Sequence, residues 1–234
     1  MYVLWARVVP FTRNSAALNW TGEVYISSQS PSKTGPFTDV NPAVNVSLNP
    51  GGDFSLMIDQ DQVAYVIYTS HVTGVRMVVE RLTRDYLYAT GQVSNVFGPA
   101  PVEAPALFRA NDRYYAIFGH TCCYCLAGSN ALVYTAPSPL GPYVYQQEIG
   151  KTSSGQPTTR SQLNYVAKLN VSQPGSGVCD VQWLWTGTRW GTSPDGSMRH
   201  DYQYWAPITI ASSNSSGVWF QNMTFEDSVE VELC

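Results

Sequence analysis

Glu103 is an acidic residue whose surroundings suit proton transfer. It lies between Pro101 and Pro105 in the run Pro101–Phe108, which is otherwise uncharged. Each proline lacks a backbone N–H and favours extended geometry in the residue before it, so Glu103 is expected at the start of a strand among apolar neighbours. Apolar surroundings disfavour a carboxylate and raise its pKa, as a general acid working near neutral pH requires. A solvated glutamate in a turn is the alternative.

Asp53 is a second carboxylate in a comparable place. It lies shortly before a run of strand-forming residues, as Glu103 does, whereas Asp59 and Asp61 are expected to shape the hairpin turn that follows. Two carboxylates in equivalent positions of neighbouring repeats would face one cavity, and the charge of Asp53 would raise the pKa of Glu103 further. Paired carboxylates over a pocket are the apparatus of glycoside hydrolysis, in which one protonates the leaving oxygen and others tune it or activate water.

The elements that must position these residues are short runs of β-branched and aromatic residues, separated by Gly, Pro, Asn or Ser. They include Tyr2–Trp5, Val24–Ser28, Ala64–Tyr68, Met77–Leu82, Tyr114–Phe118, Ala131–Thr135, Trp183–Trp185 and Tyr204–Ile208. The turns Ser32–Phe37 and Ser138–Tyr143 match each other closely. Repeats of this kind, each a small antiparallel sheet, predict an all-β β-propeller with about four blades. A β-sandwich is the alternative, but it does not explain the matched turns, and no helix is expected.

The composition excludes several classes of protein. With 234 residues and no long linker, the chain is expected to form a single domain, 1–234. Charged residues make up only 13% and aromatic residues 13%, which suits a β-rich secreted protein rather than a disordered or coiled-coil one. The net charge of −4 and the lack of a basic run argue against nucleic-acid binding. No apolar stretch approaches the roughly 18 residues needed to span a membrane.

Sequons and cysteines both indicate an extracellular protein. Asn-X-Ser/Thr sequons exceed their chance number, which favours a glycosylated, secreted protein. They begin at Asn19, Asn45, Asn170, Asn214 and Asn222. The cysteines are Cys122, Cys123, Cys125, Cys179 and Cys234. No second Cys or His pair stands at zinc spacing, so a disulfide with one cysteine left over is favoured over a metal site in the cluster.

Motifs along nearly the whole chain resemble glycoside hydrolase family 43, and most closely its exo-β-1,3-galactanase-like subgroup. In that subgroup one blade opens with Arg-Asp-Met-Thr-Leu-Phe and an Asp-rich hairpin, which Gly52–Asp61 resembles with Gly52 in place of the arginine. The next blade carries Glu-Ala-Pro-Ala, matched by Glu103–Ala106. Further matches follow in the same order at Asn111–Tyr115, Leu140–Tyr143, Gly187–Trp190 and Trp205–Ile208, with a looser one at Ser161–Tyr165.

The resemblance implies a five-bladed propeller in which Glu103 is the general acid and Asp53 modulates its pKa and orients it. Gln162 would position the attacking water in place of a carboxylate base, with a loop glutamine that binds sugar or backbone as the alternative. The resemblance implies no required cofactor and assigns no metal ligands. Family members often carry calcium on the propeller axis, so His200 is a candidate neighbour of such an ion, with a surface-loop histidine as the favoured alternative.

Asn130, His120, Trp185 and Arg189 are the residues expected to bind substrate. Asn130 matches a subgroup asparagine that could hold a sugar hydroxyl, and turn formation is its alternative role. His120 is expected either to line the pocket or to cap its strand. Trp185, like its neighbouring tryptophans, is expected either to stack on a sugar or to pack in the core. Arg189 lies in the match to a Gly-Asp-Arg-Trp segment of the subgroup.

Two departures from the family pattern bear on activity. The chain shows about four blades where the family has five, and Met1 opens directly on a strand pattern with no signal peptide. We therefore expect a chain that lacks its first blade and is weakly active or inactive. In addition, Cys122–Cys125 stands where the subgroup has Cys-Thr-Gly-Trp, so a tryptophan that would stack on the sugar is expected to be missing.

The sequence therefore predicts a secreted, inverting glycoside hydrolase that acts on galactose-containing polysaccharide of the β-1,3-galactan or arabinogalactan type. An α-L-arabinofuranosidase or β-xylosidase on the same fold is one alternative. A non-catalytic carbohydrate-binding propeller is another, and cleavage that depends on Glu103 separates it from an enzyme. The expected partner is a polysaccharide or oligosaccharide, and neither nucleic acid nor a membrane.

Overall fold

The computed structural model describes the whole chain except residues 13–16, 20–21, 49, 123–124, 173–177, 201 and 215–216. The chain divides into two compact units. Unit 1 consists of Met1–Glu103 and Ala136–Tyr143, and unit 2 consists of Ala104–Thr135 and Val144–Cys234. The described strands form antiparallel sheets of three, four, four, three and two strands, in which neighbouring strands are consecutive in sequence. The predicted all-β class is confirmed, and the four larger sheets agree with the expected number of about four blades.

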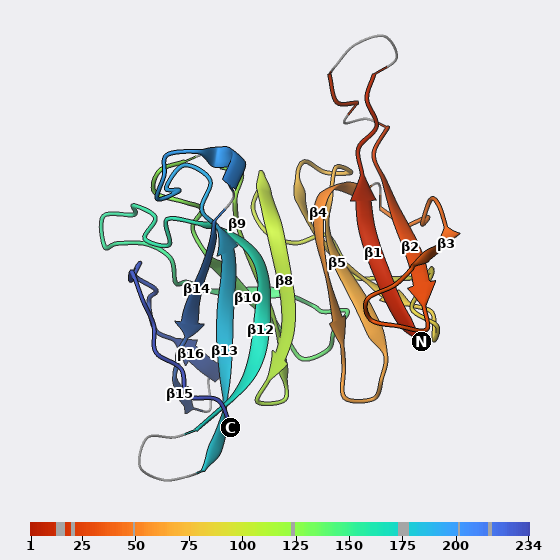
Figure 1. The fold of residues 1–234 in the computed structure, drawn as a ribbon. Helices are drawn as coiled ribbons and strands as arrows, with labels where there is room; N and C mark the ends of the chain where they lie inside the picture. The colour runs from red at the N-terminus through yellow and green to blue at the C-terminus, as the bar shows by residue number, and fades with distance from the viewer. Residues whose placement is uncertain are drawn as a thin grey trace. The chain divides into compact units, whose positions relative to one another are not determined.

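Unit 1 contains two of these sheets (Figure 1). The first is made of β1 (Tyr2–Val8), β2 (Val24–Ser30) and β3 (Thr38–Asn41), and the second of β4 (Pro50–Ile58), β5 (Ala64–Ser70), β6 (Arg76–Leu82) and β7 (Ala89–Val93). Strand β5 is buried along its whole length, as expected of an apolar strand covered on both faces. The hydrophobic core of the unit gathers side chains from both sheets, among them Trp5, Tyr25, Val66, Tyr68 and Val78.

Glu80 is a carboxylate buried inside unit 1, with no exposed surface. Its oxygens accept hydrogen bonds from the N–H of Ser47 at 2.9 Å, the Ser47 hydroxyl at 2.7 Å, the Gly91 N–H at 3.0 Å and the Tyr68 hydroxyl at 3.2 Å. Burial raises the pKa of Tyr68 well above its ordinary value, and the charge of Glu80 adds to the shift. With these four hydrogen bonds Glu80, a residue of β6, joins the loop before β4 to strands β5 and β7.

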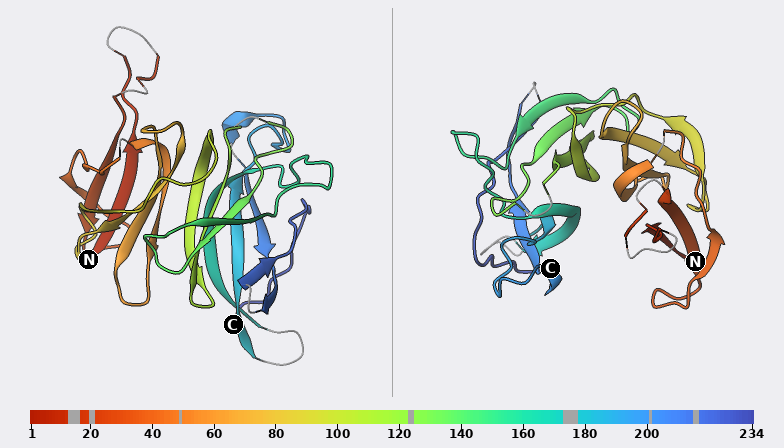
Figure 2. Two further views of the ribbon diagram at one scale, coloured as in Figure 1. Left: turned by 180° about the vertical axis from the view of Figure 1, so that it is seen from behind. Right: turned by 90° about the horizontal axis from the view of Figure 1, so that it is seen from above.

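Unit 2 carries the rest of the chain. Its strands are β8 (Val102–Ala110), β9 (Arg113–His120), β10 (Leu132–Ala136), β11 (Val144–Glu148), β12 (Gln162–Ser172), β13 (Cys179–Thr188), β14 (Gln203–Ile208), β15 (Ile210–Asn214) and β16 (Gly217–Phe220), with a 3-10 turn at Met198–His200. The first residues of β8 and the last of β10 fall in unit 1. Figure 2 shows the same strands from behind and from above. The core of unit 2 includes Phe108, Tyr115, Trp185, Ile208 and Phe220.

The two matched turns have the same backbone conformation. Gly35 and Gly141 have φ angles of +83° and +95°, and each is followed by a proline in a cis peptide bond. The N–H of each glycine donates to the carbonyl of the serine three residues before it, Ser32 at 3.2 Å and Ser138 at 2.9 Å. A φ in this range favours glycine, so the sequence match reflects a backbone requirement that the two repeats share. The prediction of one turn in two repeats is confirmed.

Two disulfides join described cysteines, Cys122 to Cys125 and Cys179 to Cys234. The first confirms the predicted disulfide in the cluster, and Cys123 lies outside the described residues. The second ties the start of β13 to the last residue of the chain, where the Ser172 N–H donates to the Glu232 carbonyl at 2.8 Å. Among the described residues no helix is long and apolar enough to cross a membrane.

Candidate active site

Asp53 lies in an irregular opening segment of β4. The register with β5 shifts between Pro50 and Phe54, and Gly52 in that segment has a φ of +133°. L side chains rarely adopt this conformation, so glycine is required where the resembled motif has arginine. The Gly52 carbonyl accepts a hydrogen bond from the Tyr25 hydroxyl at 2.8 Å. The bulge therefore places the Asp53 side chain, which is 38% exposed, next to a peptide group that the Tyr25 hydrogen bond holds in position.

The carboxylate of Asp53 is paired with Arg7, a residue of β1 that the sequence did not single out. Arg7 Nη1 donates to Asp53 Oδ1 at 3.2 Å. The same guanidinium donates from Nε and Nη2 to Glu23 Oε2, at 2.9 Å and 2.7 Å. Arg7 is the only charged residue between Met1 and Phe11, which in a chain so poor in charge was a signal that could have identified it.

Tyr25 completes this group from the buried side. Its side chain has no exposed surface. Burial raises the pKa of the Tyr25 hydroxyl far above its ordinary value, and the Glu23 carboxylate raises it further. The hydroxyl therefore stays protonated and remains a hydrogen-bond donor to the backbone at Gly52.

Glu103 lies near the start of β8, as predicted, and is partly buried. The Val102 N–H before it donates to the Val75 carbonyl at 2.9 Å, which fixes the entry of the strand. Ala104, the next residue, has a φ of +56° and is only 5% exposed. A non-glycine residue in the left-handed region costs on the order of 1–3 kcal/mol, and such residues cluster at functional sites. The backbone is thus strained directly beside the expected general acid.

Asp53 and Glu103 therefore occupy equivalent places in unit 1. Each lies near the beginning of the first strand of a four-stranded sheet, and the two sheets follow one another in the chain. Asp59 and Asp61 lie instead in the β4–β5 turn, as predicted. Their Oδ1 atoms accept the N–H of Gln60 at 2.8 Å and of Val63 at 3.0 Å.

Gln162 belongs to unit 2, where it is the first residue of β12 and is 7% exposed. Its Oε1 accepts a hydrogen bond from Trp190 Nε1 at 2.9 Å. The indole N–H fixes which end of the amide carries the oxygen. An oriented amide is suited to holding a water or a sugar hydroxyl.

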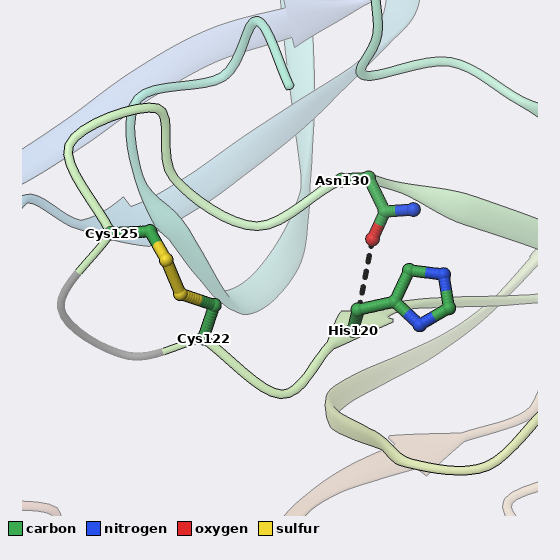
Figure 3. Close-up of a disulfide and its surroundings, with 4 residues drawn as sticks. All are labelled: His120, Cys122, Cys125 and Asn130. Carbon is green, nitrogen blue, oxygen red and sulfur yellow. Dashed lines mark hydrogen bonds between the residues drawn. A yellow bond between two sulfur atoms is a disulfide. The ribbon is translucent and has the colours of Figure 1, made fainter. Parts of the chain in front are cut away.

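Asn130 and His120 meet at the end of β9, beside the Cys122–Cys125 disulfide (Figure 3). Asn130 Oδ1 accepts the backbone N–H of His120 at 2.8 Å, and its Nδ2 donates to Glu148 Oε1. Asn130 is 8% exposed, whereas His120 is exposed. These contacts favour the structural alternative for Asn130 over sugar binding and leave the His120 ring as the accessible group of the two.

Trp185 and Arg189 both make contacts within the protein that stabilise the fold. Trp185 has no exposed surface, and its Nε1 donates to Ser161 Oγ at 3.1 Å. A fully buried ring has no face on which a sugar could stack, so the structure corrects the substrate-binding assignment of Trp185 in favour of its alternative, a core residue. Arg189 Nη2 donates to the Thr192 carbonyl at 2.8 Å, and its guanidinium lies 4.8 Å from the centre of the Phe225 ring.

His200 is an exposed residue that contacts the carboxylate of Asp195. Hydrogen bonds from Ser193 and then His200 hold the pKa of Asp195 well below its ordinary value. In the described part of the chain, no three His, Cys, Asp or Glu side chains gather closely enough to hold a metal ion. The surface-loop alternative for His200 fits these contacts.

Comparisons with known proteins identify the family and the fold of this chain. The family model of glycosyl hydrolases family 43 matches residues 2–165, a range that contains Asp53, Glu103 and Gln162. A search of curated proteins found no significant match. Among solved structures, a family 43 β-1,3-galactosidase with galactodeoxynojirimycin is similar at a TM-score of 0.66 and 18% identity, over 97% of this chain and 72% of that one.

Two exo-β-1,3-galactanases are also similar. The enzyme from Clostridium thermocellum gives a TM-score of 0.64 at 21% identity, over 83% of this chain and 41% of that one. The enzyme from Phanerochaete chrysosporium with galactose gives 0.61 at 24% identity, over 94% of this chain and 45% of that one. The chain thus spans less than half the length of these two proteins, and at such identities the likeness establishes the fold. With the family match over most of its length, the chain belongs to glycosyl hydrolases family 43 and has the β-propeller fold of that family.

Proposed function

We propose that this protein is an inverting glycoside hydrolase that acts on β-1,3-linked galactan. The observation that carries the proposal is the pair formed by Asp53 and Glu103, which occupy equivalent positions at the start of β4 and β8 inside the family match. An irregular backbone accompanies each of them, at Gly52 and Ala104. The choice of linkage is supported by the similar structures, which include a β-1,3-galactosidase and an exo-β-1,3-galactanase.

The proposed reaction is a single displacement at the anomeric carbon. Glu103 gives its proton to the glycosidic oxygen as the bond from that oxygen to the anomeric carbon breaks. Water attacks the opposite face of the sugar, forms the new carbon–oxygen bond and releases a proton to solvent. The negative charge of Asp53 keeps Glu103 protonated until the transition state, because like charges disfavour a second ionised carboxyl group. Gln162 orients the water through its amide.

We further propose that the protein is secreted and glycosylated. Two disulfides support an oxidising compartment. The sequon asparagines Asn45, Asn170 and Asn222 are exposed in the structure, as glycan attachment requires. The other two sequons include residues outside the described part of the chain. The net charge of −4 supports a neutral polysaccharide rather than nucleic acid as the partner.

A panel of substrates tests the proposed activity. Purified protein is incubated with β-1,3-galactotriose, a β-1,4-xylo-oligosaccharide and an aryl α-L-arabinofuranoside, and the released sugar is measured, with the Glu103→Gln variant as the control. We expect release from the galactotriose alone, at the low rate expected of a chain with about four blades, lost in the variant, with the α-anomer appearing first by proton NMR. Release from a pentoside would replace galactan by the arabinofuranosidase or xylosidase alternative. Binding of galactotriose without release from any substrate would make the protein a carbohydrate-binding module.

A further inference from the structure

We propose that Arg7 is the positioning residue of Asp53 and that Glu23 fixes Arg7 for this task, an inference that rests on the proposed function of Asp53 beside Glu103. The three side chains form one chain of hydrogen bonds in unit 1. Arg7 Nε and Nη2 both donate to Glu23 Oε2, at 2.9 Å and 2.7 Å. Two bonds to one acceptor set the plane of the guanidinium and aim Nη1 at Asp53 Oδ1, 3.2 Å away.

Burial decreases along this chain of hydrogen bonds from Glu23 to Asp53. The Glu23 side chain is 6% exposed, that of Arg7 25% and that of Asp53 38%. Removing a partner from a buried ion pair is costly, because the remaining charge stays in a poorly solvated place. Arg7 is therefore held from the inside by Glu23. Asp53 is the outer member, which is the place a carboxylate needs if it acts on a neighbour or a substrate.

The backbone of Asp53 is held from the same two strands. Arg7 and Tyr25 are directly opposite partners in the β1–β2 register, so their side chains share one face of the sheet. Tyr25 donates to the Gly52 carbonyl at 2.8 Å, while Arg7 holds the Asp53 side chain. Strands β1 and β2 thus fix both the peptide before Asp53 and its carboxylate, although β4 belongs to another sheet.

The Arg7 guanidinium lies directly over Gly52. A Cβ built at Gly52 would lie 3.8 Å from both Nη1 and Nη2 of Arg7 and 3.9 Å from its Cζ. The guanidinium of Arg7 therefore lies against the peptide that precedes Asp53 as well as against the Asp53 carboxylate.

In this cluster two carboxylates, those of Glu23 and Asp53, share one cation, Arg7. The expected effect of each substitution follows from this sharing. The titratable groups in it are Arg7, Glu23, Tyr25 and Asp53, with Tyr68 beyond Tyr25. The ring of His71, which is exposed, lies against Gly51. Arg7 offsets part of the negative charge that Asp53 presents to Glu103, so removing Arg7 raises the proton affinity of Glu103. Removing the charge of Glu23 leaves Arg7 to offset Asp53 alone, so this change lowers the proton affinity of Glu103.

The test is the pH profile of kcat/KM on β-1,3-galactotriose for Arg7→Gln, Arg7→Lys and Glu23→Gln. The basic limb of the profile reports loss of the proton from Glu103. We expect the limb to move up in Arg7→Gln and down in Glu23→Gln, each by about half a pH unit, and kcat to fall by about tenfold in both. Arg7→Lys keeps the charge without the planar fork, so it should restore the limb but not kcat.

Arg81→Gln is the matched control, since it removes an arginine of unit 1 whose Nη1 donates to the side chain of Gln92 in an exposed setting. Thermal unfolding of every variant shows whether it is folded. If Arg7→Gln does not fold, Arg7→Lys still tests the inference. If Asp53→Asn shifts the basic limb, two results overturn the inference. The first is a limb that stays in place in Arg7→Gln and Glu23→Gln, and the second is a limb that moves in the same direction in both. If Asp53→Asn does not shift it either, the proposed role of Asp53 is what fails.

Discussion

At the scale of the residue, Asp53 shares a guanidinium with a carboxylate that is almost entirely buried. The Arg7 side chain bonds Glu23 more closely than Asp53, at 2.7 Å against 3.2 Å. Asp53 is therefore ordered without being neutralised by a partner of its own. This suits a group that acts through its charge on a neighbouring general acid.

Asp53→Asn tests that action. The variant removes the negative charge that the proposed mechanism places beside Glu103 and keeps the side-chain volume, so Glu103 should lose its proton more easily and the basic limb of the kcat/KM profile should move to lower pH. The measurement is the rate on β-1,3-galactotriose across the pH range in which the protein is folded. A lower rate with an unmoved basic limb would make Asp53 a sugar ligand instead.

Ala104→Gly tests whether the strained backbone beside Glu103 serves activity. Glycine relieves the left-handed conformation by about 1 kcal/mol, and the lost methyl group costs a similar amount. We expect the free energy of unfolding to stay within about 1 kcal/mol of the parent while kcat falls several-fold, because Glu103 is held less firmly. Urea unfolding and turnover of the same preparation provide the two numbers. Unchanged turnover would show that the strain has no catalytic purpose.

At the scale of the element, Glu80 connects the strands of the second sheet to the loop before it. Glu80→Ala removes a buried acceptor from four donors, of which the Tyr68 hydroxyl is buried and those of Ser47 and Gly91 belong to exposed residues. A buried donor that loses its partner costs about 1–3 kcal/mol, whereas water can replace the acceptor at an exposed one, so we expect a loss of about 1–3 kcal/mol of unfolding free energy. Glu230→Ala, at an exposed position, is the control and should be nearly neutral. A small loss in Glu80→Ala would mean that water replaces the carboxylate.

The Cys179–Cys234 disulfide is the second element-scale feature, since it closes a loop with a sequence separation of 55. Restricting the unfolded chain over such a loop stabilises a protein by about 4 kcal/mol in the chain-entropy picture. Cys179→Ser with Cys234→Ser should therefore lower the unfolding free energy by a few kcal/mol, as measured by urea unfolding without reductant. The Glu232–Ser172 and Cys234–Asn170 backbone bonds beside it should be lost with it, which amide exchange can detect. If both the free energy and the exchange are unchanged, the bridge is not structural.

At the scale of the whole molecule, what the sequence could predict follows from which features are local. Most central strands of the sheets, the Asp59–Asp61 turn and the paired Gly-Pro turns depend on residues close in sequence and were predicted, whereas strands such as β3, β7, β11 and β16 were not. The Arg7–Asp53 ion pair joins β1 to β4, so no local pattern contains it. The burial of Trp185 and the pairing of Cys179 with Cys234 depend on packing within unit 2 in the same way. Glu103 was recognisable because proline residues and the lack of other charges mark its strand, whereas the left-handed Ala104 beside it has no sequence signal.

The most direct test of the central claim is the leaving-group dependence of Glu103→Gln. A general acid matters most when the leaving oxygen is a poor leaving group, as in a sugar, and least when it is a good one, as in a dinitrophenyl glycoside. We predict that the variant turns over β-1,3-galactotriose at least on the order of a hundredfold more slowly than the parent, and 2,4-dinitrophenyl β-galactoside only a few-fold more slowly. Equal and small losses on both substrates would contradict the assignment of Glu103 as the general acid.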